Sequence, residues 1–162
     1  MLGPLFAVFA ERIGGSILDI SAAWAIYLIT TGILIILIGK LSDKKGRQEE
    51  LVTIGFALNA LFTFGYLFVK SPIHLFIVQA GLGIATALST PTWNSLYAKY
   101  EDKKRTSYSW GLAVGQANIA TGIAIIIGGL IVAKYSFTML FIIMGIIQVI
   151  AALYQSKIID KI

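Results

Sequence analysis

The chain has 162 residues, of which 57% are hydrophobic and only 13% are charged, whereas soluble domains have about 45–50% and about 25%. A soluble protein of this length could not bury so much apolar surface, so the composition predicts an all-α integral membrane protein surrounded by a lipid bilayer. The net charge of +5 orients such a protein in the membrane, and it does not indicate a nucleic-acid partner.

The first apolar run, residues 2–10, is interrupted by Glu11 and Arg12 and is too short to cross a bilayer, so residues 2–12 are predicted to form only a partial span. Nine or ten helical residues reach about 15 Å, half of a hydrocarbon core of about 30 Å. We therefore interpret this run as the second half of a first helix whose start is absent. Ser16 and Asp19 follow two glycines and predict a polar turn with an N-cap for the next helix.

Five further apolar runs are long enough to span a membrane as helices. These spans are predicted at residues 20–39, 51–69, 73–97, 108–133 and 137–156. Residues 1–162 are thus predicted to form a single transmembrane helical domain, with five complete helices and the partial first one.

Lys and Arg are distributed unequally between the two sides that these spans define. The loops after the second and fourth spans, together with the C-terminal tail, hold every basic residue except Arg12, Lys70 and Lys134. Basic residues accumulate on the cytoplasmic face of membrane proteins. We therefore predict a multi-pass protein of the cell membrane whose N- and C-termini are both cytoplasmic.

The densest polar chemistry in the first half of the chain is the run Gly39-Lys40-Leu41-Ser42-Asp43-Lys44-Lys45-Gly46-Arg47. We predict that this run forms a loop between two spans, with Asp43 as its only acid. Gly39 lacks a Cβ atom and so lets two helix ends approach closely, while Gly46 can adopt a positive φ that turns the chain. A basic hairpin that only fixes orientation is the alternative interpretation.

The pattern G-x-L-x-D-x-x-G-R between two spans resembles the loop signature of the major facilitator superfamily. The resemblance covers essentially the whole chain as one six-helix half of a twelve-helix transporter. It implies two inverted three-helix repeats, with the solute bound between two halves near the midplane. It also implies a conformational-switch loop in which Asp43 and Arg47 latch the cytoplasmic side, together with Gly39, Lys40 and Gly46.

Two positions depart from the pattern of the family's drug–proton antiporters. Ile77 stands where those proteins have an arginine in the fourth span, and Ala124-Ile125 stand where a Gly-Pro pair precedes the paired glycines of the fifth. Proton-coupled drug export is therefore not supported, and the substrate stays open.

Small residues recur at helical spacing in the fourth and fifth spans. Such residues let helices approach backbone to backbone in lipid, so we predict a helix-packing role for them. They are Gly81, Ala85 and Ser89 in the fourth span, and Gly111, Gly115, Gly122, Gly128 and Gly129 in the fifth. The glycines of the fifth span could serve packing inside the half or between two copies.

Uncharged polar residues also lie at membrane depth, where each needs a partner or a water-filled cavity. Pro91 frees a backbone carbonyl in the fourth span, and several of these side chains surround it. We predict that some of them line a central aqueous cavity, with interhelical hydrogen bonding as the alternative. The candidates are Gln79, Thr86, Thr90, Pro91, Asn94, Gln116 and Asn118.

The sequence favours a secondary transporter that moves a small-molecule solute by alternating access. One half has no partner surface, so the chain is either a fragment of a longer transporter or a unit that pairs as a homodimer or with a complementary half. The alternative is a non-transporting scaffold or assembly subunit, or an inactive transporter fragment. An enzyme is disfavoured, because one histidine and no cysteine leave no hydrolytic triad or metal cluster, and no cofactor is predicted.

Overall fold

The computed structural model describes residues 2–159, and every regular element in that range is a helix. The elements are α1 (Leu5–Arg12), α2 (Ile17–Lys45), α3 (Gln48–Gly65) with the 3-10 turn η1 (Tyr66–Phe68), α4 (Pro72–Tyr100), α5 (Thr106–Lys134) and α6 (Phe137–Ile159). Five helices, α2 to α6, are long and apolar enough to cross a membrane. The predicted all-α membrane fold with a short first helix is confirmed.

The helices extend beyond the apolar runs that predict them. α2, α4 and α5 have 29 residues each, which corresponds to about 43 Å of helix beside a hydrocarbon core of about 30 Å. An apolar run marks only the part of a helix that lies in hydrocarbon. Backbone hydrogen bonding continues past that depth, so the polar ends of these helices reach the headgroup region.

The turn between α1 and α2 forms as its sequence predicts. Gly14 has φ +83°, and a Cβ atom on Gly15 would lie 2.7 Å from the backbone oxygen of Ala10, so both positions favour glycine. Ser16 then caps α2: its Oγ accepts from the Asp19 N–H at 3.2 Å, and the Asp19 carboxylate accepts from the Ser16 N–H at 2.8 Å. This reciprocal pairing fixes where α2 begins.

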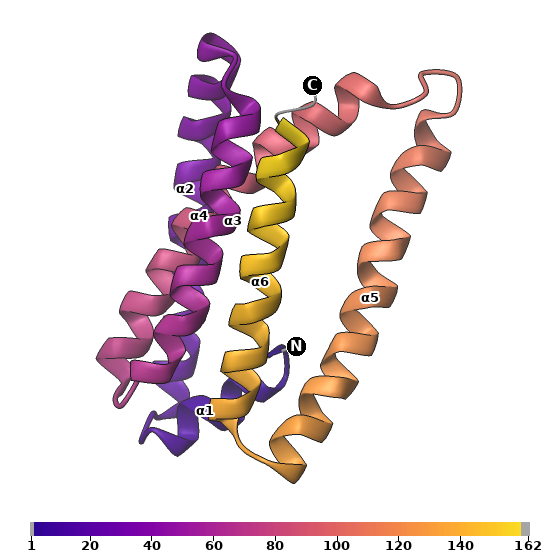
Figure 1. Ribbon diagram of the computed structural model, residues 1–162. Helices are drawn as coiled ribbons and strands as arrows, with labels where there is room; N and C mark the ends of the chain where they lie inside the picture. The colour runs from indigo at the N-terminus through magenta and orange to yellow at the C-terminus, as the bar shows by residue number, and fades with distance from the viewer. Residues whose placement is uncertain (1, 160–162) are drawn as a thin grey trace.

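Figure 1 shows α2, α3 and α4 packed together, α6 beside α3, and α5 standing apart on the far side of α6. The turn after α2, the loop after α4 and the end of α6 lie at the same end of the molecule, which we call the basic end. α1 lies at the opposite end. This arrangement brings the two lysine-rich connections of the sequence to one side.

Glycines allow α3 and α4 to approach closely. A Cβ atom on Gly55 of α3 would lie 2.8 Å from the backbone nitrogen of Ser89 and 2.9 Å from the backbone oxygen of Ala85. The ring of Phe62 lies over Gly81 in the same way, because a Cβ atom there would be 2.2 Å from the ring. The fourth-span residues Gly81, Ala85 and Ser89 thus lie in the contact between α3 and α4.

Four buried aromatic side chains, Phe9, Tyr66, Phe137 and Phe141, form an aromatic cluster at the α1 end. Phe141 of α6, only 1% exposed, contacts the rings of Phe9, Tyr66 and Phe137. The Tyr66 ring lies flat on Phe141 at 4.8 Å, and the Phe9 ring meets Phe141 edge-on at the same distance. The cluster therefore joins α1, the end of α3 and the start of α6.

α5 is fastened to the rest of the chain mainly near its ends. At the basic end, Tyr97 of α4 donates to the Ser109 carbonyl at 2.6 Å and packs edge-on against the Trp110 ring. At the other end, Ile131 and Val132 pack against the buried apolar core that contains the aromatic cluster. The middle of α5 adds little burial to the bundle.

The surroundings of the α5 glycines also show that most of this helix lies apart from the other helices. Gly128 is the buried residue of this helix. Within the described chain, no atom lies within 4 Å of where a Cβ atom would stand on Gly111, Gly115, Gly122 or Gly129. These four glycines do not pack inside the half, because α5 stands away from α2, α3 and α4. Packing between two copies or two halves stays a prediction.

Candidate functional site

A cavity of ≈ 230 Å³ lies between α1, α2, α3, α4 and α6. Its polar walls are the side chains of Tyr27, Asn59, Thr63, Tyr66, Gln79, Thr86 and Gln148. Its apolar walls are Leu2, Gly3, Phe6, Trp24, Leu82 and Met144. None of these lining residues carries a charge. Because Leu2 and Gly3 are among them, the described start of the chain lies within the bundle and away from the basic end.

Hydrogen bonds join the polar walls of this cavity across helices. The hydroxyls of Tyr27 on α2 and Thr86 on α4 are 3.3 Å apart. The Tyr66 hydroxyl donates to Gln79 Oε1 at 3.2 Å. Gln79 is only 2% exposed, and its Nε2 has no hydrogen-bond partner among the described residues. The cavity therefore contains one buried amide donor that the chain itself does not satisfy.

The aromatic cluster holds this amide in place. Tyr66 is 4% exposed, and its ring lies between the face of Phe141 and the edge of Phe9, at centroid distances of 4.8 and 5.8 Å. A ring packed in this way cannot swing its hydroxyl away from Gln79. Because Oε1 is bound to Tyr66, the Nε2 atom of Gln79 is the one left without a partner among the described residues.

A second hollow of ≈ 240 Å³ lies between α3 and α4, lined by Phe56, Ser89, Thr90, Trp93 and Asn94. The α-helix continues through Pro91 beside it. The Thr92 hydroxyl donates to the Leu88 carbonyl at 2.6 Å, which lies next to the Ala87 carbonyl that loses its ladder partner at Pro91. Thr90, Pro91 and Asn94 belong to this hollow and its helix, and they do not line the cavity around Gln79.

The structure thus separates the residues predicted to share one cavity. Gln79 and Thr86 line the first cavity, whereas Gln116 and Asn118 are exposed on α5, outside both hollows. The aromatic walls, above all Tyr27 and Tyr66, were missed by sequence reasoning. Their hydroxyls were the available signal, because a phenol at membrane depth needs a hydrogen-bond partner.

The run from Gly39 to Arg47 is mostly helical, so the predicted nine-residue loop is wrong. α2 continues to Lys45 and ends at Gly46, which has φ +61° and whose N–H donates to the Ser42 carbonyl at 3.0 Å. The polar residues of this run still favour helix once it leaves the hydrocarbon, and only glycine ends it easily. The close approach predicted at Gly39 is also wrong within the described chain, where no atom lies within 4 Å of its Cβ position.

The charged side chains at the turn between α2 and α3 differ in whether they have an ion-pair partner. Arg47 Nη2 pairs with the Glu50 carboxylate at 2.6 Å, and this hydrogen bond raises the pKa of Arg47 above its ordinary high value. Lys40 and Asp43 are exposed on the last turns of α2. Arg47 is therefore held against the first turn of α3, while the Asp43 carboxylate is accessible at the basic end.

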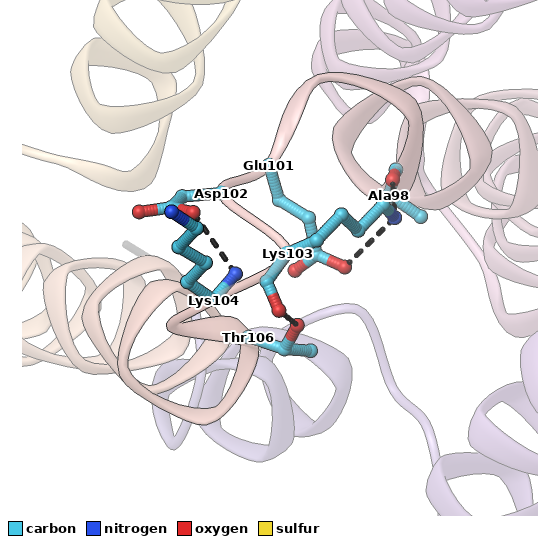
Figure 2. A network of polar contacts seen from close by, with 6 residues as sticks. All are labelled: Ala98, Glu101, Asp102, Lys103, Lys104 and Thr106. Carbon is cyan, nitrogen blue, oxygen red and sulfur yellow. Dashed lines mark hydrogen bonds and ion pairs between the residues drawn. The ribbon is translucent and has the colours of Figure 1, made fainter.

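The loop between α4 and α5 is held by one lysine (Figure 2). Lys103 Nζ donates to the Ala98 carbonyl near the end of α4 and pairs with Glu101 Oε1 at 3.3 Å. The Glu101 side chain is only 5% exposed, and its Oε2 has no partner among the described residues. Lys103 is thus the cation that pairs with the buried Glu101 carboxylate in the loop between α4 and α5.

Lys103→Met is expected to loosen this connection without unfolding the bundle. Losing a partly exposed ion pair and a helix-end hydrogen bond costs about 1 kcal/mol, which is about a fivefold rise in local opening. Hydrogen–deuterium exchange at residues 99–105 measures it. Lys104→Met is the matched control, because the Lys104 side chain is exposed and only its backbone N–H binds Asp102. Equal exchange in both variants would contradict the role of Lys103.

Five helices able to cross a membrane, four of which (α2, α3, α4 and α6) line an uncharged, partly polar cavity, define a multi-pass membrane protein of the transporter class. The chain belongs to the Major Facilitator Superfamily, which it matches over residues 1–158. The resemblance seen in the sequence is therefore confirmed, and family membership favours transport over catalysis.

Three relatives illustrate the membership. An uncharacterised MFS-type transporter of Methanocaldococcus jannaschii is 27% identical over 152 residues, which are 94% of this chain and 39% of the relative. A multi-drug resistance efflux pump PmrA homolog of Lactococcus lactis is 31% identical over 116 residues, 68% of this chain and 28% of the relative. A proton-coupled antiporter flippase LtaA of Staphylococcus haemolyticus is 26% identical over 136 residues, 82% and 34% respectively.

The chain spans about a third of the length of these curated relatives. No solved structure matches it.

Proposed function

We propose that this chain is one half of a secondary transporter that moves a small solute across a membrane by alternating access. It pairs with a second six-helix half, either another copy of the chain or a complementary one, because alternating access needs two bodies that rock about a shared site. The observation that carries the proposal is the uncharged polar cavity around Gln79. Polar groups are costly at membrane depth, so a buried amide without a partner supports a binding role.

The relatives support transport but leave the coupling open. One is named an efflux pump and another a proton-coupled flippase. Ile77 and Ala124-Ile125 depart from the drug–proton antiporter pattern. The described lining of the cavity contains no Asp or Glu. We therefore propose a small solute and assign no coupling ion.

We further propose that the basic end faces the cytoplasm of the cell membrane and that Asp43 takes part in closing it. The uneven distribution of Lys and Arg supports the orientation. The Asp43 carboxylate is exposed at the end of α2, beside an Arg47 that is already held by Glu50. A second half that approaches this end would meet the exposed Asp43 carboxylate and an Arg47 guanidinium that Glu50 holds in place.

Asp43→Asn is expected to reduce solute flux at least tenfold, because it removes the charge that the closing contact uses while keeping nearly the same shape. The measurement is uptake of a panel of radiolabelled small solutes by proteoliposomes that contain the purified chain. Glu11→Gln is the control, since it makes the same chemical change at an exposed position on the opposite end and should leave flux unchanged.

Two results would count against the proposal. No flux of any solute with the unmodified chain would favour the scaffold or inactive-fragment reading. Chemical crosslinking in the same liposomes that yields only monomers, while flux persists, would contradict pairing between copies.

A further inference from the structure

Three side-chain amides, those of Asn59, Gln79 and Gln148, line the cavity among α1, α2, α3, α4 and α6, and the Gln79 amide has a buried nitrogen without an acceptor among the described residues. Gln79 is almost completely buried, its Oε1 accepts from Tyr66, and its Nε2 has no acceptor within the described chain. An amide nitrogen carries two N–H donors and accepts nothing. The occupant that satisfies it must therefore supply a lone pair.

The size of the cavity indicates more than a single water molecule. A water occupies about 30 Å³ in the liquid, whereas the cavity measures ≈ 230 Å³. Pockets for drug-sized ligands are about 300–1,000 Å³, so the occupant is smaller than those. A molecule with roughly the bulk of one substituted aromatic ring fits this range.

The lining also selects against charge. None of the described lining residues is ionised, so a charged solute would lose its hydration without gaining a counter-charge, which is costly in a low-dielectric site. A neutral solute loses only hydrogen bonds, and Gln79 replaces one of them.

Part of the cavity lining is apolar and aromatic. The rings of Phe6 on α1 and Trp24 on α2 are 5.8 Å apart and tilted by 53°, and Met144 of α6 also lines the cavity. Such a surface suits a flat ring or a short alkyl group.

From these features we propose that the cavity binds a small uncharged solute with two parts. One part is a carbonyl or hydroxyl oxygen that accepts from Gln79 Nε2, and the other is a ring or alkyl group that packs against Phe6 and Trp24. The proposal names the solute class of the transport site and in that sense rests on the proposed function, although binding itself can be measured without transport.

Three probes of nearly equal shape test the proposal: benzamide, which is neutral, benzoate, which is an anion, and benzamidine, which is a cation at neutral pH. Binding to the whole chain in lipid nanodiscs is measured by isothermal titration calorimetry. Benzamide is expected to bind at least tenfold more tightly than either charged probe. Benzoate or benzamidine binding as tightly as benzamide, or no binding of benzamide, would overturn the proposal.

Variants of the amide locate the site. Gln79→Leu should weaken benzamide binding at least tenfold, and Gln79→Glu should shift the preference from benzamide to benzamidine because it places a carboxylate in the cavity. Gln116→Leu is the matched control: it removes a glutamine that is exposed on α5, outside the cavity, and should change nothing. If Gln79→Leu does not fold, the shift in Gln79→Glu decides, and unchanged probe preference in that variant would refute the assignment.

The binding and flux measurements fail independently. Benzamide binding that depends on Gln79, without flux in proteoliposomes, would refute transport and leave the solute class standing. Flux of charged solutes alone would refute the solute class and leave transport standing.

Discussion

Phe141→Ala is expected to lower the free energy of unfolding by about 2–3 kcal/mol, somewhat less than the ~3–5 kcal/mol of the same change in a soluble core. The reduction follows because lipid removes much of the hydrophobic term, leaving mainly lost van der Waals contact. Phe141 is 1% exposed and contacts three aromatic rings from α1, η1 and α6. Equilibrium unfolding in mixed micelles, followed by circular dichroism, measures the change.

Phe68→Ala is the control for this experiment. It removes the same ring from a residue that is 75% exposed and should change the free energy of unfolding by less than about 0.5 kcal/mol. Phe141→Ala should also weaken benzamide binding, because Tyr66 loses the ring on which it lies and no longer fixes the Gln79 amide. Equal stability of the two variants would show that the aromatic cluster does not hold the bundle together.

Gly55→Leu is expected to cost about 3 kcal/mol, at the upper end of overpacking changes. The new side chain would start 2.8 Å from the backbone nitrogen of Ser89 and 2.9 Å from the backbone oxygen of Ala85. Backbone atoms cannot rotate away as a side chain can, so α3 and α4 must separate. The same unfolding measurement detects the loss, and a spin-label distance between α3 and α4 reports the separation.

Gly32→Leu makes the matched change on α2. Gly32 is exposed, and no described atom lies within 4 Å of its Cβ position, so the variant should be at least as stable as the unmodified chain, since leucine favours helix more than glycine does. Loss of stability in Gly32→Leu comparable to that in Gly55→Leu would contradict the close contact between α3 and α4.

Composition was sufficient to predict the fold class, because apolar runs of membrane length have few alternatives to a helix. It could not place the helix ends. The run from Gly39 to Lys45 is polar, yet it remains helical until Gly46 supplies a left-handed conformation. Hydropathy indicates which residues lie in hydrocarbon. It does not indicate where the backbone hydrogen bonds of a helix end.

The candidate site was predicted only in part, for a related reason. A polar residue in a span can be recognised from the sequence, but the direction in which it points depends on how helices pack. Gln79 and Thr86 on α4 line the cavity among α1, α2, α3, α4 and α6, whereas Gln116 and Asn118 lie on the exposed surface of α5. Tyr27 and Tyr66 were not predicted, because a tyrosine combines a large apolar ring with a single hydroxyl and a span sequence does not show which of the two is used.

Because α5 contacts the other helices mainly near its two ends, we expect its orientation to depend on the thickness of the bilayer. A helix of 29 residues exceeds the thickness of most hydrocarbon cores and adjusts to it by tilting. With its middle held by few neighbours, the tilt of α5 is set by the acyl chains around it as much as by the protein, so lipids of different chain length should set different angles between α5 and the other helices.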